Sequence, residues 1–339
     1  MSDPAPPESA PRKSTEGVLR KVVLATVAGV IVFAVLGIVG DARALLGQLE
    51  RYRWAFAAGG FALATVNYVL RWVRWELYLR VLGVSDVPPV ASARIFTSGF
   101  VMSVTPGKVG EVLKSVLLEE AHGTAVARTA PIVVAERLTD LLGLSLLTAL
   151  GALAVSDGGP AAAVGLGLVG ALWLLVVARP LGELALRIAA AIPGVRRIAP
   201  GLRVAYESLR TLVAPLPFVA ATGLSVLAWG LEGVSLWVIL QGFEDPGDVT
   251  LLEATFAYGA ATIVGAVALL PGGLGLTEAG MTGALLQVGA STTPVAMAAT
   301  ILCRLATLWW AVALGVVALL WHQRTMRGAQ GVPTGSGAP

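Results

Sequence analysis

Long apolar runs, separated by short polar connections, dominate the pattern of this sequence. Six of them are long enough to cross a membrane as helices, since about 20 apolar residues at ~1.5 Å of rise per residue span the hydrocarbon layer. They lie at about 22–40, 54–78, 126–154, 161–178, 216–241 and 292–320. The pattern therefore predicts an all-α integral membrane protein with six transmembrane helices.

Two further apolar stretches, 90–121 and 251–289, are interrupted near their middles by Pro-Gly pairs. Because proline and glycine end helices, each stretch predicts two short helices joined at a tip. Each arm of the first stretch is long enough for only about 18–22 Å of helix, which does not reach the far face of the membrane. The predicted orientation of the neighbouring spans also requires each stretch to begin and end on the same side of the membrane. We therefore predict two re-entrant helical hairpins that enter from opposite faces.

The distribution of Lys and Arg predicts the orientation of the chain. The stretch 179–214 holds six arginines and is predicted to be cytoplasmic, where its spaced leucines favour amphipathic helices at the membrane surface. The connections 155–160 and 241–250 hold no Lys or Arg and are predicted to face outward, which makes both termini cytoplasmic. The arginines of 41–53 disagree with this orientation. Three arginines near the end of the second span agree with it: Arg71, Arg74 and Arg80.

The two halves of the chain share an ordered set of residues. In each half a Pro-Gly tip is followed by a glutamate and, 26 residues later (137 minus 111, and 304 minus 278), by an arginine. The common order, the equal spacing and the opposite predicted orientations indicate an inverted repeat, with repeat 1 at about 20–155 and repeat 2 at about 160–322 of one transmembrane domain, 18–322. The matched residues are Pro106, Gly107, Gly110, Glu111 and Arg137 in the first half, and Pro271, Gly272, Gly275, Glu278 and Arg304 in the second.

Charged residues within the apolar segments are expensive unless they are paired or hydrated. They include Glu136, Arg137 and Asp140 on the third span, Glu232 on the fifth and Glu253 on the second hairpin. A helix that restarts after a Pro-Gly tip points free N–H groups and its positive end into the membrane, which suits an anion such as phosphate. Two interpretations stay open: a polar cavity that holds a charged headgroup, and a network of buried ion pairs that fixes helix register.

Arg137 and Arg304 are the best candidate phosphate ligands, because a guanidinium group donates two parallel hydrogen bonds. Glu111 and Glu278 either pair with these arginines or carry a coupling proton. The full candidate binding set is Lys108, Glu111, Arg137, Asp140, Glu278 and Arg304. The candidate tip residues are Pro106, Gly107, Gly110, Pro271, Gly272, Gly273 and Gly275.

Composition narrows the class of protein. Only 13% of the 339 residues are charged and 56% are hydrophobic, which argues against a soluble domain and against a nucleic-acid binder. The ends, 1–17 and 323–339, are rich in Pro, Gly and Ser and are predicted to be disordered tails. Residues 42–44 have the small-x-small form of a signal-peptidase site, but the long apolar core before them suits an uncleaved anchor. The sequence contains no P-loop, HExxH, metal cluster or nucleophile elbow, so we expect no enzyme activity, metal, cofactor or ATP use.

The motifs at 106–111 (PGKVGE), 136–140 (ERLTD) and 270–278 (LPGGLGLTE), followed by Arg304, resemble the flippase-like membrane family that includes the N-terminal domain of bacterial lysylphosphatidylglycerol synthases. The resemblance implies a multi-pass protein of the bacterial inner membrane that moves a phospholipid or polyprenyl-linked lipid with an anionic headgroup between leaflets. In bifunctional members a soluble aminoacyl-transferase domain follows, which we do not expect in the residues after Leu320. A membrane enzyme acting on a lipid-linked substrate and an accessory subunit remain alternatives, and a homodimer is compatible with each.

Overall fold

The computed structural model describes residues 42–105, 110–152, 199–268 and 270–330, together with single positions between 163 and 178. Every regular element in these ranges is helical, as the apolar runs predict. The predicted first span, most of the predicted fourth span and the predicted N-terminal tail lie outside the described residues. So do three candidate residues of the first tip, which are Pro106, Gly107 and Lys108.

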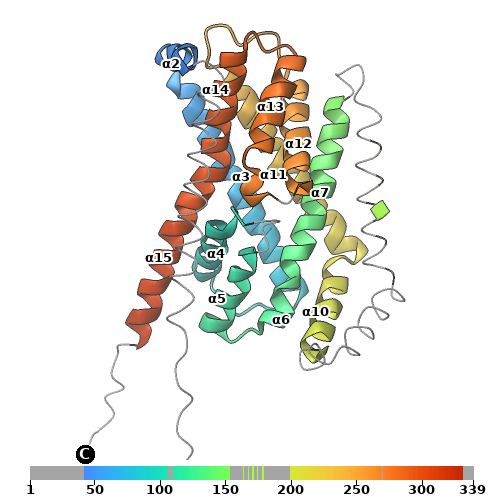
Figure 1. Ribbon diagram of the computed structural model, residues 1–339. Coiled ribbons are helices and arrows are strands. Elements are labelled where there is room, and N and C mark those ends of the chain that lie inside the picture. Colours follow the sequence, from blue (N-terminus) through green and yellow to red (C-terminus); the bar gives the residue numbers. More distant parts are fainter. Residues whose placement is uncertain are drawn as a thin grey trace, which may run out of the picture.

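Long helices run side by side through the described part of the molecule (Figure 1). They are α3 (Trp54–Val81), α7 (Pro131–Ala152), α11 (Pro215–Leu240), and the run of α14 (Thr293–Arg304), the π-helical turn η4 (Leu305–Trp309) and α15 (Trp310–Gln330). Each begins within a few residues of a predicted span. Among the described residues, two stretches are long and apolar enough to cross a membrane: Pro215–Leu240 and Thr293–Met326.

Each of the two interrupted stretches forms a pair of short helices. The first consists of α4 (Pro89–Ser98), the 3₁₀ turn η1 (Gly99–Met102) and α5 (Leu113–His122); the second consists of α12 (Leu251–Val267), the 3₁₀ turn η3 (Pro271–Gly273) and α13 (Leu276–Gln287). In Figure 1 the α4–α5 pair occupies the lower half of the molecule and the α12–α13 pair the upper half. The interruption between α4 and α5 (the first break) approaches the interruption between α12 and α13 (the second break). A Cβ placed on Gly272 of the second break would lie 3.6 Å from the Cα of Val104 of the first.

The helices pack closely where small residues face one another. A Cβ placed on Gly233 of α11 would lie 2.7 Å from the hydroxyl oxygen of Thr255 on α12, and one placed on Gly151 of α7 would lie 2.6 Å from the carbonyl oxygen of Leu252. Close backbone approach at small residues is how helices associate in membranes. Large apolar side chains cover the outside of the bundle, such as Leu216, which is 82% exposed, and this suits a surface that faces lipid.

Short helices complete the described part: α2 (Ala42–Glu50), α6 (Val126–Thr129) and α10 (Ala199–Leu212). The α10 helix falls in the stretch that the sequence predicts to be amphipathic. Arg203 and Glu207 form an exposed ion pair at 3.3 Å on it, while Leu212 is buried. The earlier part of that stretch, 179–198, lies outside the described residues.

The structure corrects two expectations. The C-terminal tail does not begin at 323, because α15 continues to Gln330, and Arg94 of α4 donates a 3.0 Å hydrogen bond to Thr325 on this extension. Glu253 is not one of the interior charges. It caps the first turn of α12, where its carboxylate accepts hydrogen bonds from the backbone N–H and the hydroxyl of Thr250 at 2.8 and 2.7 Å.

Candidate functional site

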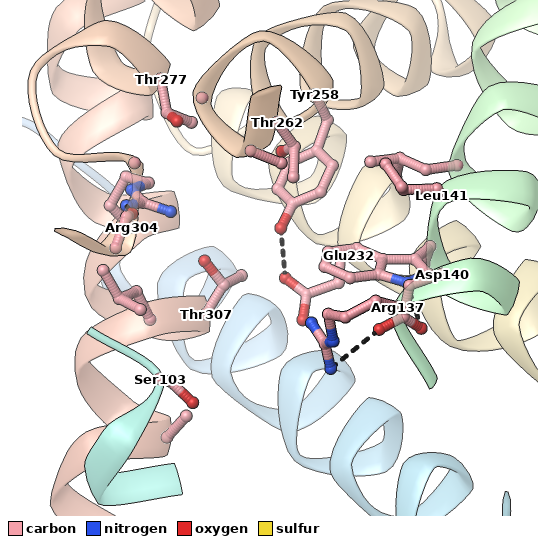
Figure 2. Close-up of a pocket in the computed structure, with 18 of the residues that line it drawn as sticks. Ser103, Arg137, Asp140, Leu141, Glu232, Tyr258, Thr262, Thr277, Arg304 and Thr307 are labelled. Atoms are coloured by element: carbon pink, nitrogen blue, oxygen red, sulfur yellow. Dashed lines mark hydrogen bonds and ion pairs between the residues drawn. The ribbon is translucent and has the colours of Figure 1, made fainter. Parts of the chain in front are cut away.

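A cavity of about 300 Å³ lies where the two breaks meet (Figure 2). Its wall comes from α3, the first break, α7, α11, α12, the second break and the π-helical turn after α14. Five charged residues line it: Arg71, Arg137, Asp140, Glu232 and Arg304. Two of the three arginines are therefore those that the sequence singles out.

Glu111 is the centre of the ionic contacts in the first half. It is buried and lies just after the first break, where Arg137 of α7 approaches its carboxylate at 3.3 Å. Lys114 and Arg71 approach the same carboxylate at 3.6 and 3.7 Å, and Lys114 also pairs with Glu136 at 2.7 Å. The predicted pairing of Glu111 with Arg137 is present, and it belongs to a larger network of buried charges.

Asp140 connects three helices. It lies one turn after Arg137 on α7, at 3.1 Å from that guanidinium, as the i, i+3 spacing predicts. Arg74 of α3 pairs with it at 2.6 Å, and Ser225 and Trp229 of α11 donate hydrogen bonds to it at 3.0 and 2.9 Å. Asp140 thus connects α3, α7 and α11 through buried contacts, as the interpretation of a network that positions helices predicts, and it also lines the cavity.

Arg304 holds the second break. Its Nε lies 2.6 Å from the carboxylate of Glu278, and its Nη2 donates a 2.6 Å hydrogen bond to the carbonyl of Gly272. The backbone N–H of Gly275 donates to the other Glu278 oxygen at 2.6 Å. Gly272, Gly273 and Gly275 all have positive φ, which explains a run of glycines here. The Glu–Arg pair therefore satisfies backbone groups that lipid could not.

The opposite side of the cavity is acidic and aromatic. Glu232 of α11 is 4% exposed, and the Tyr258 hydroxyl of α12 donates a 2.8 Å hydrogen bond to its carboxylate. Trp229 lies one turn before Glu232, and its ring centroid is 6.3 Å from that of Tyr258. Figure 2 shows Glu232 and Tyr258 across the cavity from Arg304.

Two of the arginines that line the cavity have a buried donor without a partner. Within the described part of the chain, the Nε atoms of Arg71 and Arg137 are buried and have no hydrogen-bond partner. Buried donors in proteins are almost always satisfied, and these two belong to arginines that line the cavity. The lining also includes three exposed apolar residues at the end of α12, so the cavity opens towards the apolar outside: Ala266, Val267 and Leu270.

The predicted site residues fall into three groups. Those that line the cavity are Arg137, Asp140, Gly272, Gly273 and Arg304. Glu111 and Glu278 lie behind the arginines and hold them, while Gly110, Pro271 and Gly275 shape the breaks. The third group, Pro106, Gly107 and Lys108, lies outside the described residues.

Arg71 and Arg74 require a correction. The charge pattern of the sequence places them at a cytoplasmic helix end as orientation markers, but they are 6% and 0% exposed and lie in the charge network. Helical spacing could have found them, because Asn67, Arg71, Arg74 and Tyr78 recur on one face of α3. Trp229 and Tyr258 gave no comparable signal, since aromatic residues on apolar helices usually belong to the core.

The fold and the site define a helical membrane protein with a charged interior cavity. The family model for the lysylphosphatidylglycerol synthase TM region matches residues 23–315, and the chain belongs to this family. It is also similar to proteins described as UPF0104 membrane protein from Methanothermobacter thermautotrophicus. One match is 31% identical over 139 residues, 40% of this chain and 39% of the relative; another is 32% identical over 118 residues, 35% and 32%. The matched region thus spans about a third to two fifths of these relatives.

Proposed function

We propose that this protein binds the anionic headgroup of a phospholipid or polyprenyl-linked lipid in the cavity and moves the lipid between leaflets without ATP. The lipid leaves chemically unchanged, so the protein acts as a transporter and not as an enzyme. We further propose that it resides in the inner membrane with both termini in the cytoplasm. Membership of a family of membrane proteins with a lipid-related role supports the proposal.

The observation that carries the proposal is the continuity between the arginines and an apolar opening. Arg71, Arg137 and Arg304 line the same cavity as Val267, whose side chain is 71% exposed at the end of α12. A charged headgroup pays several kcal/mol or more to enter hydrocarbon alone. In this cavity the headgroup meets guanidinium groups while its chains stay in the lipid beside α12. A water-soluble anion would gain nothing from such an opening.

The paired breaks suggest how access alternates. We propose that the α4–α5 and α12–α13 pairs are re-entrant hairpins from opposite faces of the membrane, related as inverted repeats. Transporters of this design place substrates near the membrane midplane, where broken helices meet, and open alternately to each side. The approach of Gly272 to Val104 and the equivalent Glu111–Arg137 and Glu278–Arg304 pairs support this arrangement.

Lipid movement in liposomes tests the proposal. The full chain is reconstituted with a trace phospholipid labelled on its acyl chain, and a membrane-impermeant quencher reports the label that reaches the outer leaflet. We expect the Arg137→Gln variant and the charge-balanced Glu278→Gln/Arg304→Gln variant to be at least roughly tenfold slower than wild type. Arg203→Gln, an exposed arginine of α10, serves as the matched control and should match wild type.

The outcomes separate the alternatives. Equal rates for wild-type protein and protein-free liposomes would remove the transporter and leave an accessory subunit. A lipid product of changed mass after incubation would instead identify an enzyme acting on the lipid.

A further inference from the structure

We propose that the π-helical turn η4 is a hinge, about which α14 and the α12–α13 pair move relative to α15 and the α4–α5 pair, and that Tyr68 is the residue that positions it. The inference rests on the proposed function, because alternating access requires the two pairs to move and the hinge is the element that bends. A π turn is a rare interruption of an α-helix and is frequent at functional sites. This one follows Arg304 directly, and two of its residues, Thr307 and Leu308, line the cavity.

Before the turn, the helical run packs together with the second break. Its buried apolar residues up to Ala306 share one hydrophobic core with residues of α12 and α13. Thr282 of α13 donates a 3.1 Å hydrogen bond to Thr300 of α14, and Arg304 at the end of α14 pairs with Glu278 at 2.6 Å. A movement of α14 therefore carries the second break and Arg304 with it.

After the turn, the run packs against the first break. Leu308 and Val312 share a separate core with Val101 of η1, and a Cβ placed on Gly315 of α15 would lie 2.5 Å from the backbone nitrogen of Val101. In Figure 1 the run passes from α14, beside α13 at the top, to α15, beside α4 below. Among its buried apolar residues, the change from one core to the other falls between Ala306 and Leu308, inside the turn.

Tyr68 of α3 holds the turn from outside the run. Its side chain is 6% exposed, and its hydroxyl donates to the carbonyl oxygens of Thr307 and Ala306 at 2.5 and 3.2 Å. The wider hydrogen-bond spacing of a π turn interrupts the regular ladder of an α-helix, so a donor from a neighbouring helix stabilises it. The Thr307 hydroxyl also donates to the carbonyl of Cys303 at 2.9 Å, a contact that bends helices. The shape of the bend thus depends on one hydroxyl of α3.

In the first half the equivalent segment is a regular α-helix. The offset between Glu111 and Glu278 is 167 positions (278 minus 111), so the turn Leu305–Trp309 corresponds to 138–142 (305 minus 167, and 309 minus 167). These residues lie inside α7, which is α-helical from Pro131 to Ala152. A helix of the repeat therefore reaches the cavity without a π turn, and the turn gives the second half a place to bend that α7 lacks.

Amide hydrogen exchange of the full chain in lipid nanodiscs tests for the hinge without requiring transport. The matched control lies in the same molecule, because 138–142 occupies the equivalent position in a regular helix. In wild-type protein we expect the amides of 305–309 to exchange at least roughly tenfold faster than those of 138–142, since local opening costs less where the helix is interrupted. Equal protection of the two segments would overturn the inference.

Tyr68→Phe keeps the ring and removes the hydroxyl that holds the turn. We expect exchange in 305–309 to rise roughly fivefold, the usual effect of one lost hydrogen bond. Tyr52→Phe is the matched control, because Tyr52 is 4% exposed and donates a 2.9 Å hydrogen bond to the carbonyl of Ile239 in the regular helix α11. It should leave 305–309 unchanged. No rise in Tyr68→Phe, or an equal rise in Tyr52→Phe, would overturn the role of Tyr68.

A distance measurement separates a hinge from a turn that is merely loose. Spin labels on Gln287→Cys of α13 and Arg324→Cys of α15, both exposed positions, report how the two sides of the turn lie relative to each other, while the native Cys303 is buried. We expect Tyr68→Phe, but not Tyr52→Phe, to broaden the distribution of label distances. Identical distributions in wild type and Tyr68→Phe would overturn the hinge.

The wild-type exchange comparison needs no variant, so it decides the matter even if Tyr68→Phe fails to fold. If the turn exchanges and bends as expected but no lipid moves in liposomes, only the proposed function fails. If lipid moves while 305–309 and 138–142 are equally protected, only this inference fails.

Discussion

The two halves of the molecule keep one ion pair and differ in nearly everything around it. Glu111 and Arg137 correspond to Glu278 and Arg304, with an offset of 167 positions in both cases (278 minus 111, and 304 minus 137). In the first half the glutamate is shared among three basic residues. In the second half Glu278 contacts Arg304 and the backbone N–H of Gly275.

The residues found at the same offset in the two halves explain this difference. At the same offset, three charged residues of the first half correspond to neutral residues of the second: Lys114, Glu136 and Asp140 to Met281, Cys303 and Thr307. The extra charges of the first half connect its Glu–Arg pair to α3 and α11. Because fewer ionic contacts restrain it, we expect the second hairpin to move more easily than the first.

The largest expected effect on stability comes from breaking the network of buried charges in the first half. Arg74→Met leaves Asp140 buried without its closest basic partner, so we expect a loss of about 3–5 kcal/mol in the free energy of unfolding. Thermal unfolding of the detergent-purified protein measures it. The double variant Arg74→Met/Asp140→Leu should recover much of this loss, since no charge is then stranded. A loss as small as that of an exposed arginine would show that the network does not anchor the helices.

Breaking the ion pair of the second half should reduce stability less, and its effect should stay close to the second break. Arg304→Gln removes two charge-assisted hydrogen bonds, which predicts a loss of roughly 2–3 kcal/mol in the free energy of unfolding. Because Arg304 holds the carbonyl of Gly272, amide hydrogen exchange should rise first in 270–276. Faster exchange in α4 and α5 of the same variant would contradict an effect confined to the second break.

Much of this arrangement could be predicted from the sequence, because hydrophobic length and helix-breaking residues are local signals. The starts of α3 and α11, both breaks and the Glu–Arg pairs follow from run lengths, Pro-Gly tips and repeated spacing. The close contacts between helices at small residues could not be predicted in this way, because they depend on pairs of residues far apart in the sequence.

What could not be predicted depends on tertiary contacts. Arg74 looks like a charge at a helix end until α7 and α11 bring Asp140 and Ser225 to it. Glu253 looks like an interior charge until α12 begins beside it and makes it a cap. Tyr258 becomes part of the site only because α12 packs against α11 and brings it to Glu232. In each case the residue type is ambiguous and the neighbouring helix decides its role.

A smaller effect tests the backbone of the second break. Gly275 has φ 86°, and a Cβ placed on it would have no atom within 4 Å, so an alanine side chain fits there without obstruction. Gly275→Ala therefore isolates the cost of the positive-φ backbone, about 1–3 kcal/mol. Gly283, inside α13, also has open space around its Cβ position. Gly283→Ala should therefore be neutral or stabilising by roughly 0.5–1 kcal/mol. Similar shifts in the melting temperature for both variants would contradict the strained tip.

The smallest effect concerns an ion pair outside both hairpins. Arg203 and Glu207 on α10 are 77% and 66% exposed, so water screens their interaction at 3.3 Å. Arg203→Ala should change the free energy of unfolding by less than about 0.5 kcal/mol, because exposed pairs of this spacing contribute only a few tenths. Melting temperatures measured at low and high salt should differ by the same amount for wild type and variant. A loss comparable to that of Arg304→Gln would mean that burial is not what separates these pairs, and the contrast between the two halves would then need another cause.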